Sequence, residues 1–262
     1  MSAPGHMRLY AFHCGGDRSD RAIFDPFDPD VGTKIYAPYF FYLVQHPEGN
    51  VLFDTGVHPG IRDDPHGRLG DAAEAIVVEM EPDDDVVSQL QKLGMEPGEI
   101  DHVVQSHLHF DHAGGLEFFP HATIYVQRTE LSFAYWPAVY QRGLYLRADF
   151  DHELRWKELD GEYDLFGDGR VVLIPTPGHT PGHQSMLVRL SEQPIVLLSD
   201  ATYLMEKMRE RLLPAIVWSP DAMVASWEVL EDIERRLGAR LICTHDTDFR
   251  ETMKLAPEEW YE

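Results

Sequence analysis

Short runs of apolar residues, many of them alternating with polar ones, recur along the chain and predict β-strands, because successive side chains of a strand point to opposite faces. These runs are Arg8–His13, Tyr39–Gln45, Val51–Asp54, His102–Gln105, Ala122–Gln127, Val171–Pro175, Gln184–Leu190, Ile195–Ser199 and Arg240–Thr244. The turn-forming residues Pro47, Glu48, Gly49 and Asn50 predict a hairpin between the second and third runs.

Two segments, Asp83–Leu93 and Ser219–Leu237, instead have the spacing of an amphipathic helix. The longer one begins with Ser219 at the N-cap and is followed by Gly238, where a positive φ is easily adopted. Their apolar stripes are Val86, Val87, Leu90 and Leu93, and Met223, Trp227, Leu230, Ile233 and Leu237. Strands that pair into hairpins, with helices between them, predict an α/β fold of two sheets sandwiched between helices.

No linker rich in proline, glycine or serine divides the chain, so we expect one domain over residues 8–262. Because Gly5-His6-Met7 resembles a cloning scar, we interpret residues 1–7 as a tag remnant or a disordered N-terminus. A chain of 262 residues that is 44% hydrophobic can bury a large core without disulfide bonds. Its two cysteines, Cys14 and Cys243, lie far apart in the sequence, which favours a reducing, cytoplasmic location.

The charge of the chain narrows its expected partners. The net charge is −23, from 22 basic and 45 acidic residues. A surface this negative repels phosphate backbones and anionic lipids, so we expect neither nucleic acid nor a membrane as a partner. No apolar run approaches the roughly 20 residues that span a bilayer. The composition therefore indicates a soluble, acidic protein.

The densest cluster of metal-binding residue types is the segment Ser106–His112, which follows a short apolar strand. In an extended segment His107 and His109 point the same way, so both can bind one ion. If the chain then turns, Asp111 and His112 can face a second ion. Zinc, iron and manganese all accept neutral imidazole and carboxylate as ligands. This density favours metal binding over a histidine-rich surface loop.

Further candidate ligands stand at the ends of predicted strands. His179 and His183 lie in a turn between two strands, Asp200 follows the apolar strand Ile195–Ser199, and His245 follows the last predicted strand. A carboxylate directly after a buried strand costs free energy unless it is paired or bound to a metal. Together these residues predict a site for two metal ions.

In this order and spacing, these motifs and Asp54-Thr55-Gly56 resemble those of the metallo-β-lactamase superfamily, from about Arg8 to the C-terminus. Within it the chain is most similar to the N-acyl-homoserine lactonases, the quorum-quenching branch. Thr176–Ser185, Asp200–Tyr203 and His245-Asp246 carry this narrower resemblance. The resemblance implies a four-layer αββα sandwich with metals at one edge. It also implies a carboxylic ester hydrolase that opens the ring of N-acyl-homoserine lactones.

The resemblance also implies a role for each site residue. It assigns His107, His109 and His179 to one metal, Asp111, His112 and His245 to the other, and Asp200 as the bridge between them. Asp54 would orient the ligands, and His183 would be structural. Two divalent ions, zinc first and iron, cobalt or manganese as alternatives, would supply a shared hydroxide that attacks the lactone carbonyl. Tyr203 would hydrogen-bond the carbonyl, and Asp111 would carry a proton to the leaving oxygen.

An acyl chain requires an apolar wall beside the metals. The candidates for this wall are Phe133, Trp136, Tyr140, Tyr145, Met205, Ile216 and Trp218. Aromatic and methionine stripes more often belong to a core, so packing stays an alternative for each of them. The apolar loop between Phe133 and Tyr145 could also support a homodimer.

Other functions remain as alternatives. Another lactonase or a glyoxalase-II-like thioesterase would keep a similar ligand set, although the acidic tail Pro257–Glu262 lacks a basic cluster for glutathione. A β-lactamase of the commonest zinc class would have cysteine in place of Asp200, and a nuclease would need a basic strip. A metal-stabilised scaffold without turnover is disfavoured, because closed structural zinc sites often use cysteine.

Overall fold

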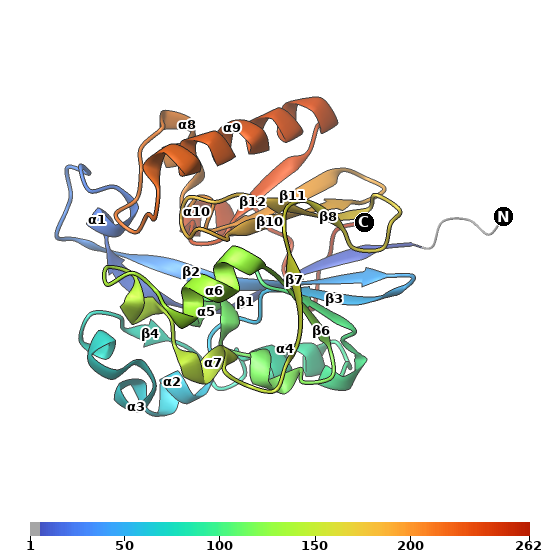
Figure 1. Cartoon of the computed structure of the whole chain (residues 1–262), viewed down its shortest axis with the longest axis horizontal. Coiled ribbons are helices and arrows are strands. Elements are labelled where there is room, and N and C mark those ends of the chain that lie inside the picture. The colour runs from blue at the N-terminus through green and yellow to red at the C-terminus, as the bar shows by residue number, and fades with distance from the viewer. Residues whose placement is uncertain (1–5) are drawn as a thin grey trace.

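Two β-sheets pack face to face in the computed structural model, which describes residues 6–262, and helices cover the outer face of each sheet (Figure 1). This arrangement confirms the predicted αββα sandwich. Our interpretation of the N-terminus falls largely on residues 1–5, which lie outside the described residues. Met7, which we included in that segment, is buried and packs in the core between the sheets.

The larger sheet contains, in spatial order, β4 (Val78–Glu79), β1 (Arg8–Asp20), β2 (Lys34–His46), β3 (Gly49–Phe53), β5 (His102–Val104), β6 (Thr123–Gln127) and β7 (Arg155–Leu159). The smaller sheet contains β12 (Arg240–Cys243), β11 (Pro194–Ser199), β10 (Gln184–Arg189), β9 (Val171–Pro175) and β8 (Tyr163–Asp164). Strands β3, β5, β6 and β7 run parallel, and so do β11 and β12. The loops that follow these strands therefore leave the sheets at shared edges.

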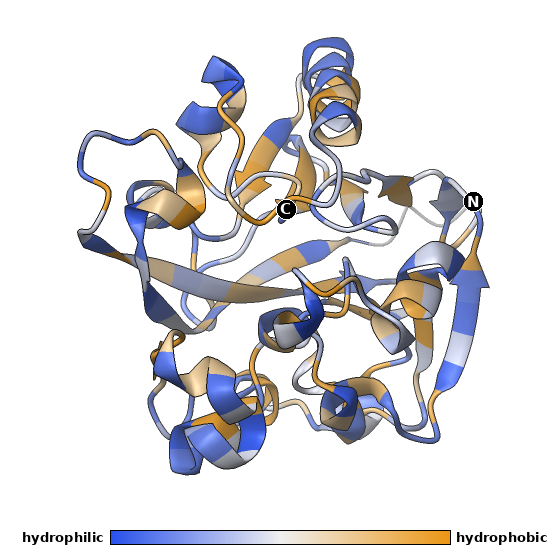
Figure 2. Ribbon diagram, turned by 60° about the vertical axis from the view of Figure 1, so that its left-hand side comes forward, coloured by the Kyte–Doolittle hydropathy of each residue, from blue (hydrophilic) through white to orange (hydrophobic). Residues whose placement is uncertain are grey.

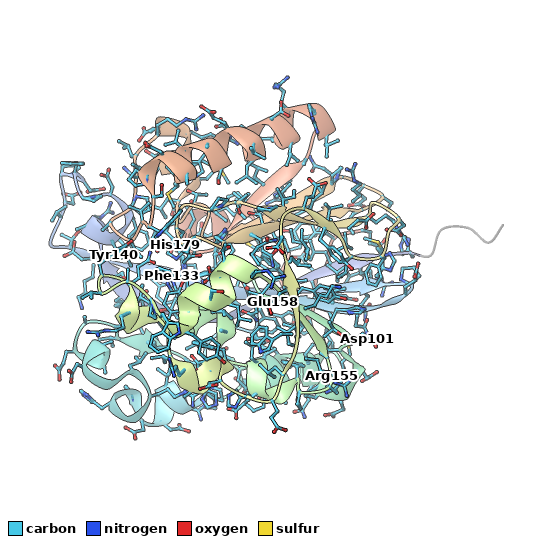
Figure 3. The ribbon with its side chains drawn as sticks, in the orientation of Figure 1. Asp101, Phe133, Tyr140, Arg155, Glu158 and His179 are labelled. Carbon is cyan, nitrogen blue, oxygen red and sulfur yellow. The ribbon has the colours of Figure 1, made fainter. Side chains whose placement is uncertain are left out.

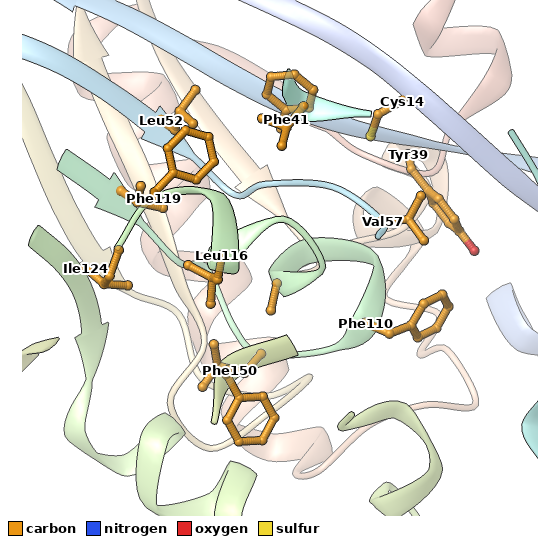
Figure 4. Close-up of a cluster of buried hydrophobic side chains, with 14 of the residues drawn as sticks. Cys14, Tyr39, Phe41, Leu52, Val57, Phe110, Leu116, Phe119, Ile124 and Phe150 are labelled. Atoms are coloured by element: carbon orange, nitrogen blue, oxygen red, sulfur yellow. The ribbon is translucent and has the colours of Figure 1, made fainter. Parts of the chain in front are cut away.

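Strand β2 explains why the sheets stack, because it is buried on both faces. Tyr39, Phe41 and Leu43 pack toward the outer helices, in the cluster that Figure 4 shows. The alternate residues Phe40, Tyr42 and Val44 pack between the two sheets. A strand with two apolar faces must be covered on both sides, and this requirement produces the layers.

The helices are α1 (Arg21–Phe24), α2 (Gly60–Asp63), α3 (Pro65–Leu69), α4 (Val86–Lys92), α5 (Phe110–Ala113), α6 (Arg128–Tyr135), α7 (Arg147–Phe150), α8 (Met205–Glu210), α9 (Pro220–Leu237) and α10 (Thr247–Arg250). Single 3₁₀ turns occupy Gly70–Glu74, Pro97–Glu99, Leu116–Phe118 and Arg142–Leu144. As predicted, Ser219 caps α9 and Gly238 ends it in the left-handed conformation. Figure 2 shows apolar strands inside and mixed polarity on the outer helices. Within residues 6–262, no helix is long and apolar enough to cross a membrane.

Several predicted elements differ in extent from those observed, and one segment for which no element was predicted is also structured. The helix predicted from Asp83 begins at Val86, because the Asp85 side chain accepts hydrogen bonds from the backbone N–H groups of the first turn. Strand β1 continues past His13 to Asp20 through a register shift at a pair of glycines. The segment from residue 128 to 158 has little periodicity but folds into α6, α7 and β7.

A partly buried ion pair joins two of the helices that cover the larger sheet. Arg68 of α3 donates a hydrogen bond of 2.6 Å from Nη2 to Oδ1 of Asp149 on α7. Asp149 is 1% exposed. Burial raises the pKa of the Asp149 carboxyl to about 7, although the Arg68 charge acts in the opposite direction.

This raised pKa predicts that Asp149 makes the folded protein less stable as the pH rises from about 4 to about 7, because over that range the folded state binds more protons than the unfolded state. Asp149→Asn cannot titrate at this position. Urea unfolding at about pH 5 and about pH 8 should therefore show a smaller loss of unfolding free energy in the variant than in the wild type. Asp151→Asn, at an exposed neighbouring position, should behave like the wild type. The same pH dependence in Asp149→Asn and the wild type would contradict the prediction.

Candidate metal centre

Loops from both sheets meet at one edge of the sandwich. The larger sheet contributes Asp54 after β3 and the segment His107–His112 after β5. The smaller sheet contributes His179 after β9, Asp200 after β11 and His245 after β12. These loops lie together because the strands that precede them in each sheet share one direction.

The structure brings all seven candidate ligands together in overlapping groups of three. In each group, one nitrogen or oxygen atom per residue lies within 4.8 Å of the others. The groups are His107, His109 and His179; His107, His112 and Asp200; and Asp111, His112 and His245. All of these residues are buried.

Asp200 lies between the two ends of the cluster. Its Oδ2 is 3.3 Å from Nε2 of His179. Its Oδ1 is 3.3 Å from Nε2 of His112 and 3.1 Å from Nε2 of His245. One carboxylate oxygen therefore faces each end, which is the geometry expected of a bridging ligand.

A change of backbone conformation separates the two ends. His109 is extended, with φ −70° and ψ 158°, and α5 begins at the next residue. This turn directs Asp111 and His112 toward His245, while His109 lies toward His179. The predicted turn in the chain after His109 is therefore present.

Four of the rings are oriented by a hydrogen-bond partner at Nδ1. The Nδ1 atoms of His179 and His245 donate to the carbonyl oxygens of Ile216 and Pro38, each at 3.1 Å. Nδ1 of His107 lies 3.0 Å from Oγ of Ser106, and Nδ1 of His112 lies 2.9 Å from Oδ2 of Asp54. Support of this kind leaves Nε2 to face the centre of the cluster.

The two ends of the cluster differ in their electrostatics. Burial lowers the pKa of His107, His109 and His179, which keeps these imidazoles neutral, the form that binds a metal ion. Burial also opposes a charge on His112 and His245. There the neighbouring carboxylates outweigh burial and raise the pKa of both rings. The carboxylates thus attract positive charge to this end, as a proton or as a metal cation.

The donor set fits two divalent cations. Buried atoms without a hydrogen-bond partner in the described part of the chain include Nε2 of His107, His109 and His112, and Oδ1 of Asp200. Such atoms are costly to bury, and a cation at the centre of the cluster would satisfy them. The imidazole and carboxylate set suits zinc, iron or manganese.

Asp54 connects the loop that follows β5 to the loop that follows β11. Its Oδ1 accepts a hydrogen bond from the backbone N–H of Ser106, and its Oδ2 accepts one from the Ser106 hydroxyl, both at 2.8 Å. The hydroxyl of Ser199, beside Asp200, donates to the same carboxylate at 3.2 Å. Asp54 has φ 60°, a conformation that a non-glycine residue adopts only where its surroundings compensate for the strain.

Glu130 of α6 is a second buried support, which sequence analysis missed. Its carboxylate accepts hydrogen bonds from the backbone N–H groups of Leu108 and Gly182 and from the hydroxyls of Thr180 and Tyr145. It therefore connects the loop of His109 to the loop of His179. No local pattern marks this glutamate, because its partners come from three separate segments.

His183 lies outside the three ligand groups. Its Nδ1 is 2.9 Å from Oγ1 of Thr176, and burial lowers the pKa of its ring to about 3. His183 therefore lies beside the cluster, with its ring centroid 5.3 Å from that of His107, but it belongs to none of the three ligand groups.

A cavity of about 270 Å³ opens beside the cluster. His109, Asp111, Asp200 and His245 line its inner end. Much of its wall is apolar and consists of Ile23, Phe24, Ala37, Tyr39, Ala75, Ile76, Phe110, Leu144 and Ile216. The cavity can therefore hold an apolar group next to the metal-binding residues.

The apolar wall predicted from the sequence is largely wrong, because only Ile216 of the seven candidates lines this cavity. Phe133 and Tyr145 pack against each other, and the Tyr145 hydroxyl is bonded to Glu130. Trp136 and Tyr140 are 82% and 64% exposed. Met205 packs at the core under α9, and Trp218 is partly exposed. Figure 3 shows Phe133 and Tyr140 with His179 on one side of the molecule.

Tyr203, which the resemblance assigns to the substrate carbonyl, lines the cavity. Its ring packs edge-on against Phe24, and its hydroxyl oxygen is 3.4 Å from Nδ1 of His179. Burial raises the pKa of the phenol well above its usual value. The hydroxyl is therefore protonated near neutral pH and can donate a hydrogen bond.

Curated relatives match most of this chain. It is 40% identical over 233 residues to the N-acyl homoserine lactonase AttM of Rhizobium johnstonii, which covers 87% of this chain and 89% of that protein. It is 31% identical over 229 residues to an N-acyl homoserine lactonase of Bacillus thuringiensis, with 87% and 88% covered.

Solved structures match the fold equally well. One is an N-acyl homoserine lactone hydrolase with the product N-hexanoyl-L-homoserine bound at its catalytic metal centre. That structure superposes with a TM-score of 0.87 at 28% identity and covers 97% of this chain and 98% of its own. Residues 38–245 match the family described as the metallo-beta-lactamase superfamily. The fold, the cluster and these matches establish that the chain belongs to the metallo-beta-lactamase superfamily.

Proposed function

We propose that the chain is a metal-dependent hydrolase that opens the lactone ring of N-acyl homoserine lactones. One observation carries the proposal: a buried histidine and aspartate cluster ends at a mainly apolar cavity that contains Tyr203. The names of its relatives support the same substrate class. The cavity suits a lactone head at the cluster and an acyl chain along the apolar wall.

Two divalent cations, when bound by the cluster, would lower the pKa of a shared water molecule and polarise the lactone carbonyl. We propose His107, His109 and His179 as ligands at one end, Asp111, His112 and His245 at the other, and Asp200 as the bridge. Zinc is the preferred ion, because a set of histidine and aspartate ligands with an open position is typical of catalytic zinc.

Tyr203 and Asp111 would act on the substrate from the wall of the cavity. The Tyr203 hydroxyl would donate a hydrogen bond to the carbonyl oxygen as negative charge develops there. Oδ2 of Asp111 lies 3.4 Å from Nε2 of His112, and the residue also lines the cavity. This position supports the proposal that its carboxylate carries a proton to the alkoxide that leaves when the ring opens.

The proposal predicts acid release from N-acyl homoserine lactones. A pH-indicator assay should detect ring opening with short-chain and long-chain lactones and little turnover of S-lactoylglutathione or nitrocefin. Chelation should abolish this activity, and added zinc should restore it. Turnover of the thioester in place of the lactones would instead favour the thioesterase alternative, and cleavage of nitrocefin would favour a β-lactamase.

Tyr203→Phe should lower kcat/KM for a homoserine lactone about 10- to 100-fold, because it removes one hydrogen-bond donor from the developing oxyanion. The aromatic contact with Phe24 remains, so the thermal unfolding midpoint should change little. Tyr135→Phe is a matched control, since that hydroxyl bonds to Asp151 outside the cavity. Equal kcat/KM values for Tyr203→Phe and the wild type would contradict the proposed role.

Asp111→Asn should reduce kcat by at least about 100-fold, because an amide cannot carry a proton between the reacting oxygens. The fold should persist, and the amide oxygen remains available to a metal ion. Steady-state rates should be compared at equal metal content, measured by elemental analysis of the purified proteins. A near-normal kcat with both metals bound would show that Asp111 is not the proton carrier.

A further inference from the structure

One buried carboxylate in the cavity lies outside the proposed metal cluster. Asp17, near the end of β1, lines the cavity and is only 6% exposed. In the sheet it lies opposite Ala37 of β2, another residue of the cavity wall. Tyr39 and Tyr203 line the same cavity.

The protein leaves part of this carboxylate unsatisfied. Oδ2 of Asp17 accepts a hydrogen bond of 2.6 Å from the Ser19 hydroxyl. Within residues 6–262, Oδ1 accepts no hydrogen bond and no basic group lies within ion-pair distance of Asp17, although the charges of His245 and Lys34 favour its ionised form. The neighbouring Arg18 is bound to Glu79, at 2.6 Å.

Burying a carboxylate with so few partners lowers the stability of the folded protein. Burial raises the pKa of Asp17, which reflects the free energy of holding a charge in the cavity. Asp20 provides a contrast, because its Oδ1 accepts hydrogen bonds from the backbone N–H groups of Ala22 and Gly32 at the start of α1. Asp20 also lines the cavity, but it is less buried and its Oδ1 holds the start of α1. Asp17 is the more buried of the two carboxylates, and its Oδ1 is available to a ligand in the cavity.

We propose that Oδ1 of Asp17 binds the amide N–H of the substrate and thereby selects lactones that carry an acylamino group. This inference rests on the proposed function. In an N-acyl homoserine lactone the amide nitrogen is attached to the carbon next to the ring carbonyl. A ring held beside Tyr203 therefore carries its only N–H donor into the same cavity, and a carboxylate is a strong acceptor for it.

Two substrates and two variants test this inference. The substrates are N-hexanoyl homoserine lactone and α-hexanoyloxy-γ-butyrolactone, in which an ester oxygen replaces the N–H group. Asp17→Leu removes the acceptor at similar size. Asp17→Asn removes the charge but keeps an acceptor oxygen, because its amide can donate to Ser19. Glu81→Gln controls for the loss of one negative charge near β1, since Glu81 follows β4, is exposed, lies outside the cavity and has no ion-pair partner within residues 6–262.

The wild type should prefer the amide substrate about 10- to 100-fold in kcat/KM for ring opening, because the ester leaves the buried acceptor unpaired. Asp17→Leu should lose this preference, because its kcat/KM should fall for the amide substrate and stay the same for the ester substrate. Asp17→Asn and Glu81→Gln should keep most of this preference. Comparing both substrates in each protein isolates this one contact.

Three results would overturn the inference. The wild type could open both lactones with equal kcat/KM, Asp17→Leu could keep the wild-type preference for the amide substrate, or Asp17→Leu could lose the same factor in kcat/KM on both substrates. The first of these needs no variant, so the test holds even where a substitution impairs folding. In all three, the wild type still opens the lactone, and the proposed function stands. If the wild type opens neither lactone under metal-replete conditions, the proposed function fails and the role of Asp17 fails with it.

Discussion

The structure depends on the burial of five imidazoles and two carboxylates in mutual contact. These groups are largely removed from bulk water, and several of their nitrogen and oxygen atoms have no partner in the described part of the chain. Such a cluster is favourable only if positive charge is present among the ligands and each side chain is held in one orientation. The first condition explains the fit to metal cations. The second explains the surrounding hydrogen bonds, in which Asp54 and Glu130 together engage the loops of His109, His112 and His179.

Close packing adds to this support. A Cβ atom at Gly178 would lie 2.4 Å from Cα of Met223 on α9, and one at Gly182 would lie 2.2 Å from the backbone nitrogen of Glu130 on α6. The loop that contains His179 is thus held between a helix over the smaller sheet and a helix over the larger one. Only glycine allows the backbone to approach both helices this closely.

The sequence predicted the parts of the molecule that have local patterns. The strands before the ligands, the caps of α9 and the segment His107–His112 are such parts, because periodicity, capping and metal-ligand spacing act over a few residues. The wall of the cavity has no such pattern. It comes from the extension of β1 past a register shift, from α1 and from residues near position 75, so only the tertiary fold assembles it. Exposed aromatic residues such as Trp136 were mistaken for this wall, since composition does not distinguish a cavity from an outer surface.

His245 follows a strand of the smaller sheet, yet its ring is fixed by the carbonyl oxygen of Pro38 in the larger one. The cluster is therefore completed only when the two sheets have docked. During synthesis on the ribosome, the five candidate ligands up to His179 emerge before Asp200 and His245, and so before the bridge and the last imidazole exist. A metal site that uses all seven candidate ligands could therefore form only after both sheets have formed and docked, and metal content would then report on complete assembly of the fold.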